Sequence, residues 1–265
     1  MSKTIMICDA DSILFATAFA MKDEPLSAVI TKVDDFLISI ANSCSAESLL
    51  VCLTEGKSWR KQYAKTKEYK GNRVGRELPP YLNDLRAHLK DRWKAFYVSH
   101  WEADDLIFMA RTVYNTRFPD HKVFMATNDK DCRQFAGDFV DFKKMVFFTV
   151  SHDEAQKSLW TQMIVGDTSD NIAGIQGIGK VGAEKMLQDQ AVPDYPAIVL
   201  KAYIAKYGER DGVEKFYESY KLLKLIDKCE DGGLEPSIVP DPITVDYNGH
   251  SELSETSSQD SPTAI

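Results

Sequence analysis

The sequence contains no apolar run that approaches the roughly 20 residues needed to cross a membrane. Its five cysteines form no CxxC pair, and its five histidines show no metal-ligand spacing, which argues against a zinc site and against a disulfide framework. Residues 1–9 have the pattern of a strand rather than of a signal peptide, so we expect a cytoplasmic protein without membrane association. With 265 residues, 27% of them charged and 44% hydrophobic, the chain can bury a large globular core.

The net charge of −8 is unevenly distributed along the chain. Residues 227–265 hold nine acidic side chains against one lysine and lack hydrophobic periodicity, so we expect this acidic tail to be mostly disordered. The rest of the chain holds 31 basic and 31 acidic side chains. Eight of the basic ones fall within residues 57–76, next to a single acid, Glu68. Such a run is typical of a solvated helix face, but it also suits binding to a nucleic-acid backbone.

Short apolar runs alternate with helical patterns in the first part of the chain. The runs have the length of strands buried on both faces of a parallel sheet, and they cover residues 5–8, 49–53, 95–98 and 123–126. The helical patterns cover residues 26–41, 78–92 and 102–116. This alternation predicts an α/β fold over residues 1–150, with a mostly parallel central sheet flanked by helices. Residues 151–226 are predicted to form a second, helical region.

Carboxylates gather where these strands are predicted to end. Ligands of parallel sheets bind beyond the carboxyl ends of the strands, so we expect many of these acids to share one cleft. They are Asp9, Glu55, Glu102, Asp104, Asp105, Asp129, Asp131, Asp167 and Asp170. Two carboxylates about 4 Å apart repel by roughly 4 kcal/mol at an effective dielectric of about 20, so such a cluster needs neutralising cations. Oxygen ligands suit Mg²⁺ or Mn²⁺, although each acid taken singly also fits a helix cap or a loop.

A glycine-rich turn lies between two helical patterns of the second region. Residues 174–180 read Gly-Ile-Gln-Gly-Ile-Gly-Lys and open a helix. The three glycines allow backbone amides to approach a phosphate, and the helix N-terminus adds positive potential. The pattern is typical of a helix-hairpin-helix, with a plain glycine-rich turn as the alternative. It matches neither a P-loop nor a dinucleotide fingerprint, which disfavours binding of a nucleoside triphosphate.

In this order, the motifs resemble the 5′ nuclease superfamily: the flap endonucleases, the 5′ nuclease domain of bacterial DNA polymerase I, and phage-encoded 5′ to 3′ exonucleases. The resemblance covers about residues 3–226, and residues 53–61 are most similar to the phage branch. Its most specific stretches are residues 69–73, 102–105, 127–131 and 166–179.

The resemblance implies two Mg²⁺ ions, with Mn²⁺ able to substitute. The first ion would be held by Asp9, Glu55, Glu102 and Asp104. The second would be held by Asp129, Asp131 and Asp170, with Asp105 and Asp167 as outer or shared contributors. Glu55 departs from the aspartate that the family usually has at this strand end, which puts its role as a direct ligand in question.

The resemblance also implies how DNA is held. Lys70 and Arg73 would contact the scissile phosphate, and Tyr69 would stack on a base. Residues 57–92 would form a helical arch that gathers a free 5′ end, with Arg60 and Lys61 contacting DNA at its base. Duplex phosphates would be held by the glycine hairpin, with a K⁺ ion in many relatives, through Gly174, Gly177, Gly179 and Lys180.

The implied activity is that of a monomeric, structure-specific 5′ to 3′ exonuclease or flap endonuclease. It would act on DNA with a 5′ end, nick or flap, and RNA:DNA hybrids are a further candidate substrate, in replication, primer removal or recombination. Two alternatives remain open. Residues 9–12 and 166–170 mimic motifs of haloacid-dehalogenase-like phosphatases, in which Asp9 would attack phosphorus and Asp11 would act as general acid. The other alternative is a non-catalytic DNA-binding protein.

Overall fold

The computed structural model describes residues 3–228, 232–245 and 247, and it is built on a six-stranded sheet in the order β5-β4-β3-β1-β2-β8. The four inner strands are parallel and the two edge strands run antiparallel to their neighbours. The inner strands are β1 (Thr4–Asp9), β2 (Ser48–Cys52), β3 (Lys122–Ala126) and β4 (Gly137–Asp141). The edges are β5 (Val146–Val150) and β8 (Ile243–Thr244). The prediction of a mostly parallel central sheet is confirmed.

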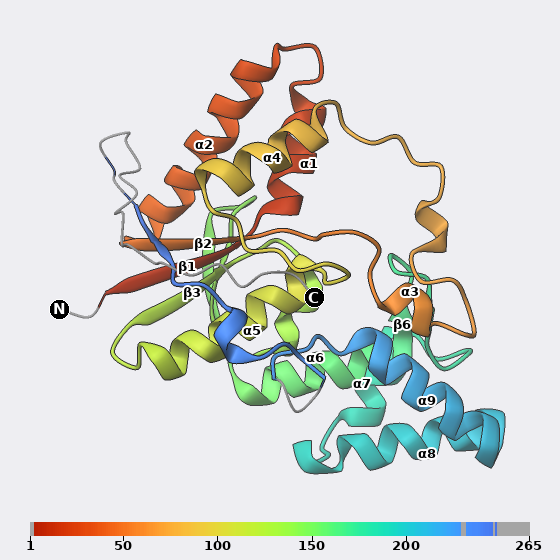
Figure 1. Cartoon of the computed structure of the whole chain (residues 1–265). Helices are drawn as coiled ribbons and strands as arrows, with labels where there is room; N and C mark the ends of the chain where they lie inside the picture. The colour runs from red at the N-terminus through yellow and green to blue at the C-terminus, as the bar shows by residue number, and fades with distance from the viewer. Residues whose placement is uncertain (1–2, 229–231, 246, 248–265) are drawn as a thin grey trace.

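Helices cover both faces of this sheet, as Figure 1 shows. Alternate residues of β1 point to opposite faces, so Met6 packs on one side and Ile7 on the other. The first side is covered by α1 (Ala10–Ala20), α2 (Leu26–Ser43) and α4 (Leu82–Arg92). The opposite side is covered by α5 (Ala103–Arg117). The runs of consecutive apolar residues in the strands reflect this burial on two faces.

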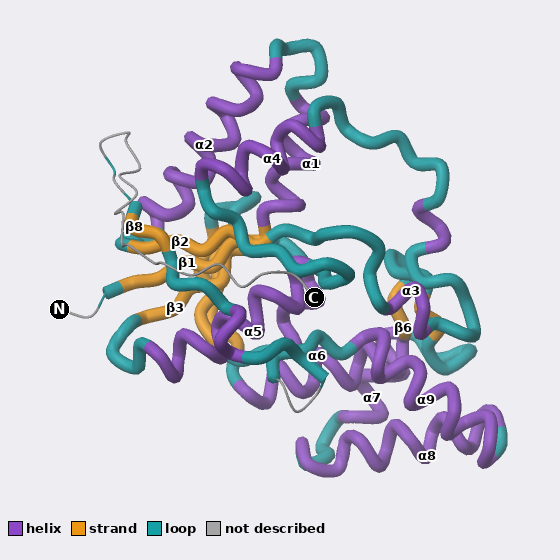
Figure 2. The backbone as a smooth tube through the Cα atoms, in the orientation of Figure 1, coloured by secondary structure: helices purple, strands orange, loops and turns teal. Residues whose placement is uncertain are grey.

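A separate apolar cluster, centred on Trp160, Tyr203 and Phe216, holds the second region together. Its helices are α6 (His152–Val165), α7 (Lys180–Leu187), α8 (Tyr195–Tyr207) and α9 (Glu209–Leu223). Between α6 and α7 lies a two-stranded ribbon of β6 (Gly166–Asp167) and β7 (Ile172–Ala173), apart from the main sheet (Figure 2). Short 3-10 turns complete the described structure: η1 (Gly71–Arg73), η2 (Lys130–Gln134), η3 (Val192–Asp194) and η5 (Pro236–Ile238). None of the described helices is long and apolar enough to span a membrane.

Two predicted elements take a different form. Residues 95–98 run beside β2 but make only isolated bridges, Cys52 with Phe96 and Glu55 with Ser99, instead of a sheet strand. Only half of the predicted helical arch is helical, because helix within residues 57–92 is confined to α3 (Arg60–Tyr63), η1 and α4. Two consecutive prolines, Pro79 and Pro80, disfavour helix just before Leu82. The chain between α3 and α4 nevertheless crosses from the lower helices to the upper ones, at the right of Figure 1.

The expectation of a disordered tail does not hold for residues 232–245. Val239 and Val245 are buried, and the hydroxyl of Tyr114 donates a 2.7 Å hydrogen bond to the carbonyl of Pro240. Strand β8 adds to the edge of the sheet beside β2. Apolar residues spaced among prolines therefore dock on the body without helical or strand periodicity. The remainder of the predicted tail, residues 229–231, 246 and 248–265, lies outside the described residues.

We expect Val239→Asp to lower the free energy of unfolding by about 3 kcal/mol, because it removes a buried apolar side chain and buries a charge in its place. Urea unfolding followed by circular dichroism measures the change. The neighbouring Ile238 is 47% exposed, so Ile238→Asp is a matched control with little expected effect. Equal losses in the two variants would contradict the docked arrangement.

Candidate active site

A cleft of about 430 Å³ opens beside the carboxyl end of β1, and its walls carry many charged side chains. Its acidic members are Asp9, Asp11, Glu102, Asp104, Asp129 and Asp170. Its basic members are Lys57, Lys61, Lys70, Arg73 and Arg86. The fold thus brings together residues separated by as much as 161 positions in the sequence, Asp9 and Asp170, as a parallel sheet does at its carboxyl edge.

Three aspartates from three elements face one another at the floor of the cleft. Asp9 ends β1, Asp104 lies in the first turn of α5, and Asp129 follows β3. Burial raises the pKa of Asp9 to about 7, helped by the charges of Asp11 and Asp129, although a hydrogen bond from Ser12 opposes the shift. Burial and the charges of Asp9 and Asp129 likewise raise the pKa of Asp104 well above its usual range. Asp9 and Asp104 therefore lack enough positive charge around them.

Asp131 and Asp167 form a second acidic group close to Asp129. Burial and the charges of Asp129 and Asp167 raise the pKa of Asp131 to about 7. Burial would also raise the pKa of Asp167, but a 2.7 Å hydrogen bond from Lys130 lowers it. Gln162 of α6 donates to both, at 2.8 Å to Asp131 and 3.1 Å to Asp167. Neither Lys130 nor Gln162 belongs to a motif that would have predicted its place in this group.

The residues of the Tyr69–Arg73 stretch sit against the acidic wall of the cleft. Lys70 donates from Nζ to Glu102 and lies 3.7 Å from Asp170, and Arg73 Nη2 lies 2.6 Å from Asp170. The backbone N–H of Lys70 also donates to the carbonyl of Asp170 at 2.8 Å. Both cations therefore reach the cleft from a backbone that is fixed to the β6–β7 turn.

Tyr69 itself is buried. Its hydroxyl oxygen lies 3.0 Å from Glu102 Oε2 and 2.8 Å from Asp170 Oδ2, so its single proton is shared between the two carboxylates. It therefore orients two carboxylates of the cleft, and it is not placed to stack on a base as expected.

Arg60 forms a buried ion pair rather than a surface for DNA. Its guanidinium pairs with Asp105 at 2.8 Å from Nη2 and with Glu102 at 3.0 Å from Nη1. It also donates to the carbonyls of Leu222 and Lys224 near the end of α9. The side chain of Arg60 is 1% exposed and that of Asp105 is fully buried, so this structure offers neither to DNA or to an ion in the cleft.

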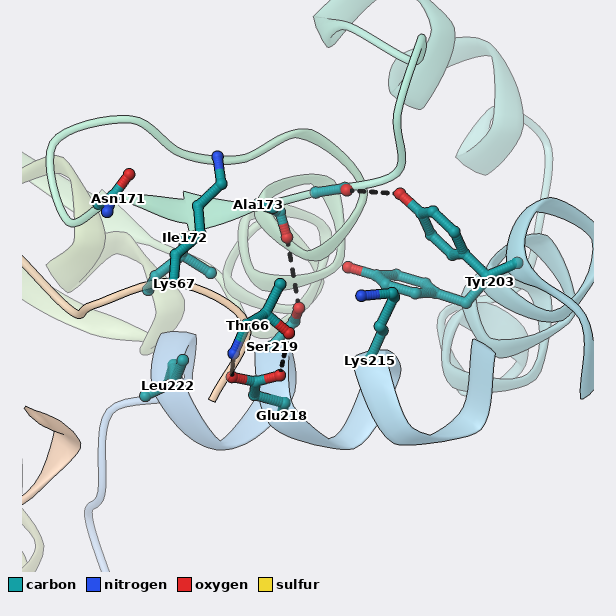
Figure 3. A pocket seen from close by; sticks show the side chains of 12 residues that line it. Thr66, Lys67, Asn171, Ile172, Ala173, Tyr203, Lys215, Glu218, Ser219 and Leu222 are labelled. Carbon is teal, nitrogen blue, oxygen red and sulfur yellow. Dashed lines mark hydrogen bonds between the residues drawn. The ribbon is translucent and has the colours of Figure 1, made fainter. Parts of the chain in front are cut away.

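Glu218 of α9 forms hydrogen bonds with the segment that follows α3, as Figure 3 shows. The carboxylate of Glu218 accepts hydrogen bonds from the backbone N–H of Lys65 and, at 2.7 Å, of Thr66, as well as from the Thr66 hydroxyl. These contacts fix the segment that leads into Tyr69 and Lys70. Ser219, the next residue of α9, donates to the carbonyl of Ala173 in the adjacent ribbon.

The glycine hairpin presents backbone to solvent ahead of α7. Gly177 has φ +89°, and no described atom lies within 4 Å of the position that a Cβ would take on Gly177 or Gly179. Gly174 is different, since a Cβ there would meet the carbonyl oxygen of Ile164 at 2.3 Å. Gly174 therefore serves close packing, and the open part of the hairpin is Gly177–Gly179 with Lys180, whose side chain is exposed.

A family model described as "5′-3′ exonuclease, N-terminal resolvase-like domain" matches residues 4–162, more than half of the chain. The chain therefore belongs to the 5′–3′ exonuclease family. Membership confirms the resemblance inferred from the motifs. It places the chain among nucleases, not with haloacid-dehalogenase-like phosphatases, which removes that alternative.

Relatives in this exonuclease family include bacterial DNA polymerases I. The chain is 30% identical over 159 residues to the enzyme of Bacillus subtilis, which covers 53% of the chain and 17% of the polymerase. It is 28% identical over 216 residues to the DNA polymerase I of Borreliella burgdorferi, and this alignment covers 71% of the chain and 23% of the polymerase. The chain thus spans less than a quarter of the length of these two relatives.

Solved structures of the same fold come from bacteriophage T5. The T5 5′-exonuclease with bound zinc has a TM-score of 0.66 at 21% identity, and the alignment covers 86% of this chain and 92% of that one. The T5 flap endonuclease, in a pseudo-enzyme–product complex with DNA and metal ions, has a TM-score of 0.57 at 19% identity and 83% and 99% coverage. These likenesses support the fold described above.

The exonuclease-family cleft therefore contains some of the predicted site residues and excludes others. Asp9, Glu102, Asp104, Asp129, Asp170, Lys61, Lys70 and Arg73 line it. Glu55 does not line it and pairs with Lys90 at 2.6 Å. Its longer side chain reaches α4, which accords with its departure from the aspartate of the family. Arg86 lines the cleft without having been predicted as part of the nuclease site, and Asp11 lines it as well.

Proposed function

We propose that this chain is a divalent-metal-dependent nuclease that cleaves DNA phosphodiesters near a 5′ end, nick or flap. The observation that carries the proposal is the meeting of Asp9, Asp104 and Asp129 with Lys70 and Arg73 in one cleft. Carboxylates supply ligands for hard cations, and the two basic side chains supply charge for a phosphate. The solved T5 flap endonuclease complex, which holds DNA and metal ions in the same fold, supports the proposal.

The donor set fits Mg²⁺ or Mn²⁺. Its members are oxygen ligands, and burial together with neighbouring carboxylates raises the pKa of Asp9, Asp104 and Asp131. In the described residues, no three Asp, Glu, His or Cys side chains form a ready-made set of direct ligands. Mg²⁺ usually keeps several waters and takes one or two carboxylates, so spaced aspartates suit it. We assign Asp9, Asp104 and Glu102 to one ion and Asp129, Asp131, Asp167 and Asp170 to a second.

The side chains of the cleft would have different roles in phosphodiester hydrolysis. When bound, the ions would lower the pKa of a water nucleophile and stabilise the leaving oxygen. Lys70 and Arg73, now paired with Glu102 and Asp170, would exchange these partners for the phosphate and stabilise the charge that develops on it. Tyr69 would hold Glu102 and Asp170 in place meanwhile.

Product analysis on a set of 5′-labelled substrates tests this proposal. Blunt duplex, nicked duplex, a 5′ flap and an RNA primer on DNA are digested with Mg²⁺, and the product lengths are read on a denaturing gel. We expect mononucleotides or short oligonucleotides released from the 5′ end, including the RNA end of the hybrid. Such substrates occur in replication, primer removal and recombination. Products released from the 3′ end would contradict the proposal.

Lys70→Ala should slow the chemical step about 10²-fold with a small effect on affinity, because its charge matters most as charge develops on the phosphate. Single-turnover cleavage at several enzyme concentrations separates the maximal rate from the Kd. Lys61 lines the same cleft with an exposed side chain, so Lys61→Ala is the control and should change mainly the Kd. A Lys70→Ala variant that changes only the Kd would show that Lys70 is a general phosphate contact.

Gly179→Val should weaken binding of long duplex DNA about tenfold while the protein stays folded, because the added side chain occupies open space where a phosphate would approach. Gly179 has φ −95°, which valine adopts without strain. Fluorescence anisotropy measures the Kd, and cleavage of a short single strand that does not reach the hairpin serves as control. Equal losses on both substrates would argue that the turn only supports the fold.

A further inference from the structure

Arg86 of α4 lines the cleft from a different segment of the chain than Lys70 and Arg73, and the proposed mechanism gives it no role. It lines the cleft together with Asp9 and Asp104, and its side chain is 26% exposed. Helices α1 and α4 pack against each other above the sheet (Figure 1), and Arg86 belongs to α4. Cations from two separate segments of the chain therefore line the same acidic cleft.

A short chain of hydrogen bonds fixes the position of Arg86 relative to the floor of this cleft. Arg86 Nη2 donates to Asp11 Oδ1 at 2.8 Å, and the other oxygen of Asp11 accepts from the backbone N–H of Thr54 at 2.8 Å. The hydroxyl of Thr54 in turn accepts from the N–H of Ala103 at 3.0 Å, next to Asp104. Thr54, just after β2, thus fixes Asp11, and Asp11 fixes Arg86. Because Thr54 also binds the first turn of α5, the position of Arg86 is set relative to that turn.

The guanidinium of Arg86 keeps unused donors. Within the part of the chain that the structure describes, Nη2 donates to Asp11, the Nη1 donors carry no hydrogen bond, and Nε is buried without a partner. An arginine carries five N–H donors in a planar fork that matches the oxygens of a phosphate. An arginine that only links two helices would be expected to use more of its donors. Arg60, for example, donates to four different residues in the same fold.

We propose that Arg86 binds a second phosphate of the DNA strand in the cleft, one that is not the scissile phosphate, and that Asp11 positions it. The proposal rests on the proposed nuclease function and deepens it. Lys70 and Arg73 approach the cleft from the β6–β7 side, whereas Arg86 approaches from α4. A strand that passes between these walls presents successive phosphates to each of them, which fixes its register over the carboxylates.

Single-turnover cleavage of a 5′-flap substrate set tests the assignment. Each substrate carries one neutral methylphosphonate linkage at a different position around the cleavage site, and cleavage at several enzyme concentrations gives the Kd. We expect Arg86→Gln to raise the Kd for unmodified DNA about tenfold. For the wild-type protein, a methylphosphonate at one non-scissile linkage should raise the Kd by a similar factor. For Arg86→Gln, a methylphosphonate at that linkage should raise the Kd by about twofold or less.

Three controls make the outcome decisive. Lys90→Gln removes another paired cation of α4 that does not line the cleft, and it should keep the wild-type pattern of linkage sensitivity. Arg86→Lys keeps the charge without the fork and should recover part of the sensitivity. Thermal melting should show all three variants folded.

Loss of affinity in Arg86→Gln with undiminished sensitivity at every linkage would overturn the assignment and leave Arg86 a brace for α4. Unchanged affinity in Arg86→Gln would overturn it as well. A wild-type protein that cleaves none of the substrates would instead contradict the proposed nuclease function, and the assignment of Arg86 would fall with it.

Discussion

Replacing Asp104 with asparagine is expected to reduce the single-turnover rate of DNA cleavage by about 10³-fold without unfolding the protein. Asp104 lies beside both Asp9 and Asp129, so it contributes to the charge that would hold an ion at the centre of the cleft. Asparagine keeps the size and one oxygen of the side chain but removes the negative charge. Asp84 lies in the first turn of α4 and does not line the cleft, so Asp84→Asn should cleave at the wild-type rate.

The same substitution should stabilise the protein in the absence of metal. Burial and neighbouring carboxylates raise the pKa of Asp104 in the folded state above its unfolded value. The folded state therefore binds the proton of the Asp104 carboxyl more tightly than the unfolded state does. The stability that this proton contributes is present at low pH and is lost as the pH rises towards the folded pKa. In EDTA, Asp104→Asn should melt near the wild-type temperature at about pH 4 and above it at about pH 8. A melting temperature below wild type at pH 8 would contradict this account of the cleft.

Removal of Arg60 should cause the largest loss of stability among single substitutions in this region. Arg60→Met leaves Glu102 and Asp105 without their buried partner, and breaking such a pair typically costs about 3–5 kcal/mol. The carbonyls of Leu222 and Lys224 also lose a donor, so the link between α3 and α9 weakens. Chemical denaturation measures the loss. Lys61→Met, an exposed neighbour, should change stability by less than about 0.5 kcal/mol.

The stability contributed by the ion pairs of Arg60 changes with pH in the opposite direction to the stability contributed by the Asp104 proton. Burial would raise the pKa of Glu102, but Lys70 and Arg60 bring it down to about 2. The stabilisation is therefore present above the ordinary glutamate pKa and is lost as the pH falls towards 2. The difference between wild type and Arg60→Met should accordingly be large at pH 7 and shrink below about pH 4. A difference that is small at pH 7 would show that Arg60 is dispensable for the fold.

The buried strands and the place of the site could be predicted because both depend on local patterns. Apolar runs marked β1, β2 and β3, and the acids after β1 and β3 fell at the carboxyl edge of the sheet. The roles of adjacent acids could not be separated in this way. Asp104 and Asp105 are neighbours in α5, and successive residues of a helix point about 100° apart. One therefore faces the cleft, while the other faces Arg60.

Long-range partners account for the remaining differences. Arg60 lies in a run of exposed lysines, and its burial is decided by acids 42 and 45 residues away. Residues 232–245 dock through scattered contacts such as Val239 on α5 and a two-residue strand beside β2. The Asp11–Arg86 pair likewise joins residues 75 positions apart. No pattern within a short window of sequence specifies such contacts.

The most direct test of the nuclease site is the metal dependence of cleavage at a 5′-labelled flap. The full chain is incubated with the substrate in EDTA, then with increasing Mg²⁺, and Asp104→Asn is measured beside it. We expect no cleavage in EDTA, short 5′ fragments that appear with Mg²⁺, and a loss of about 10³-fold in the variant. Cleavage that persists in EDTA, or an Asp104→Asn variant as fast as wild type, would contradict the claim that these carboxylates form a metal-dependent active site.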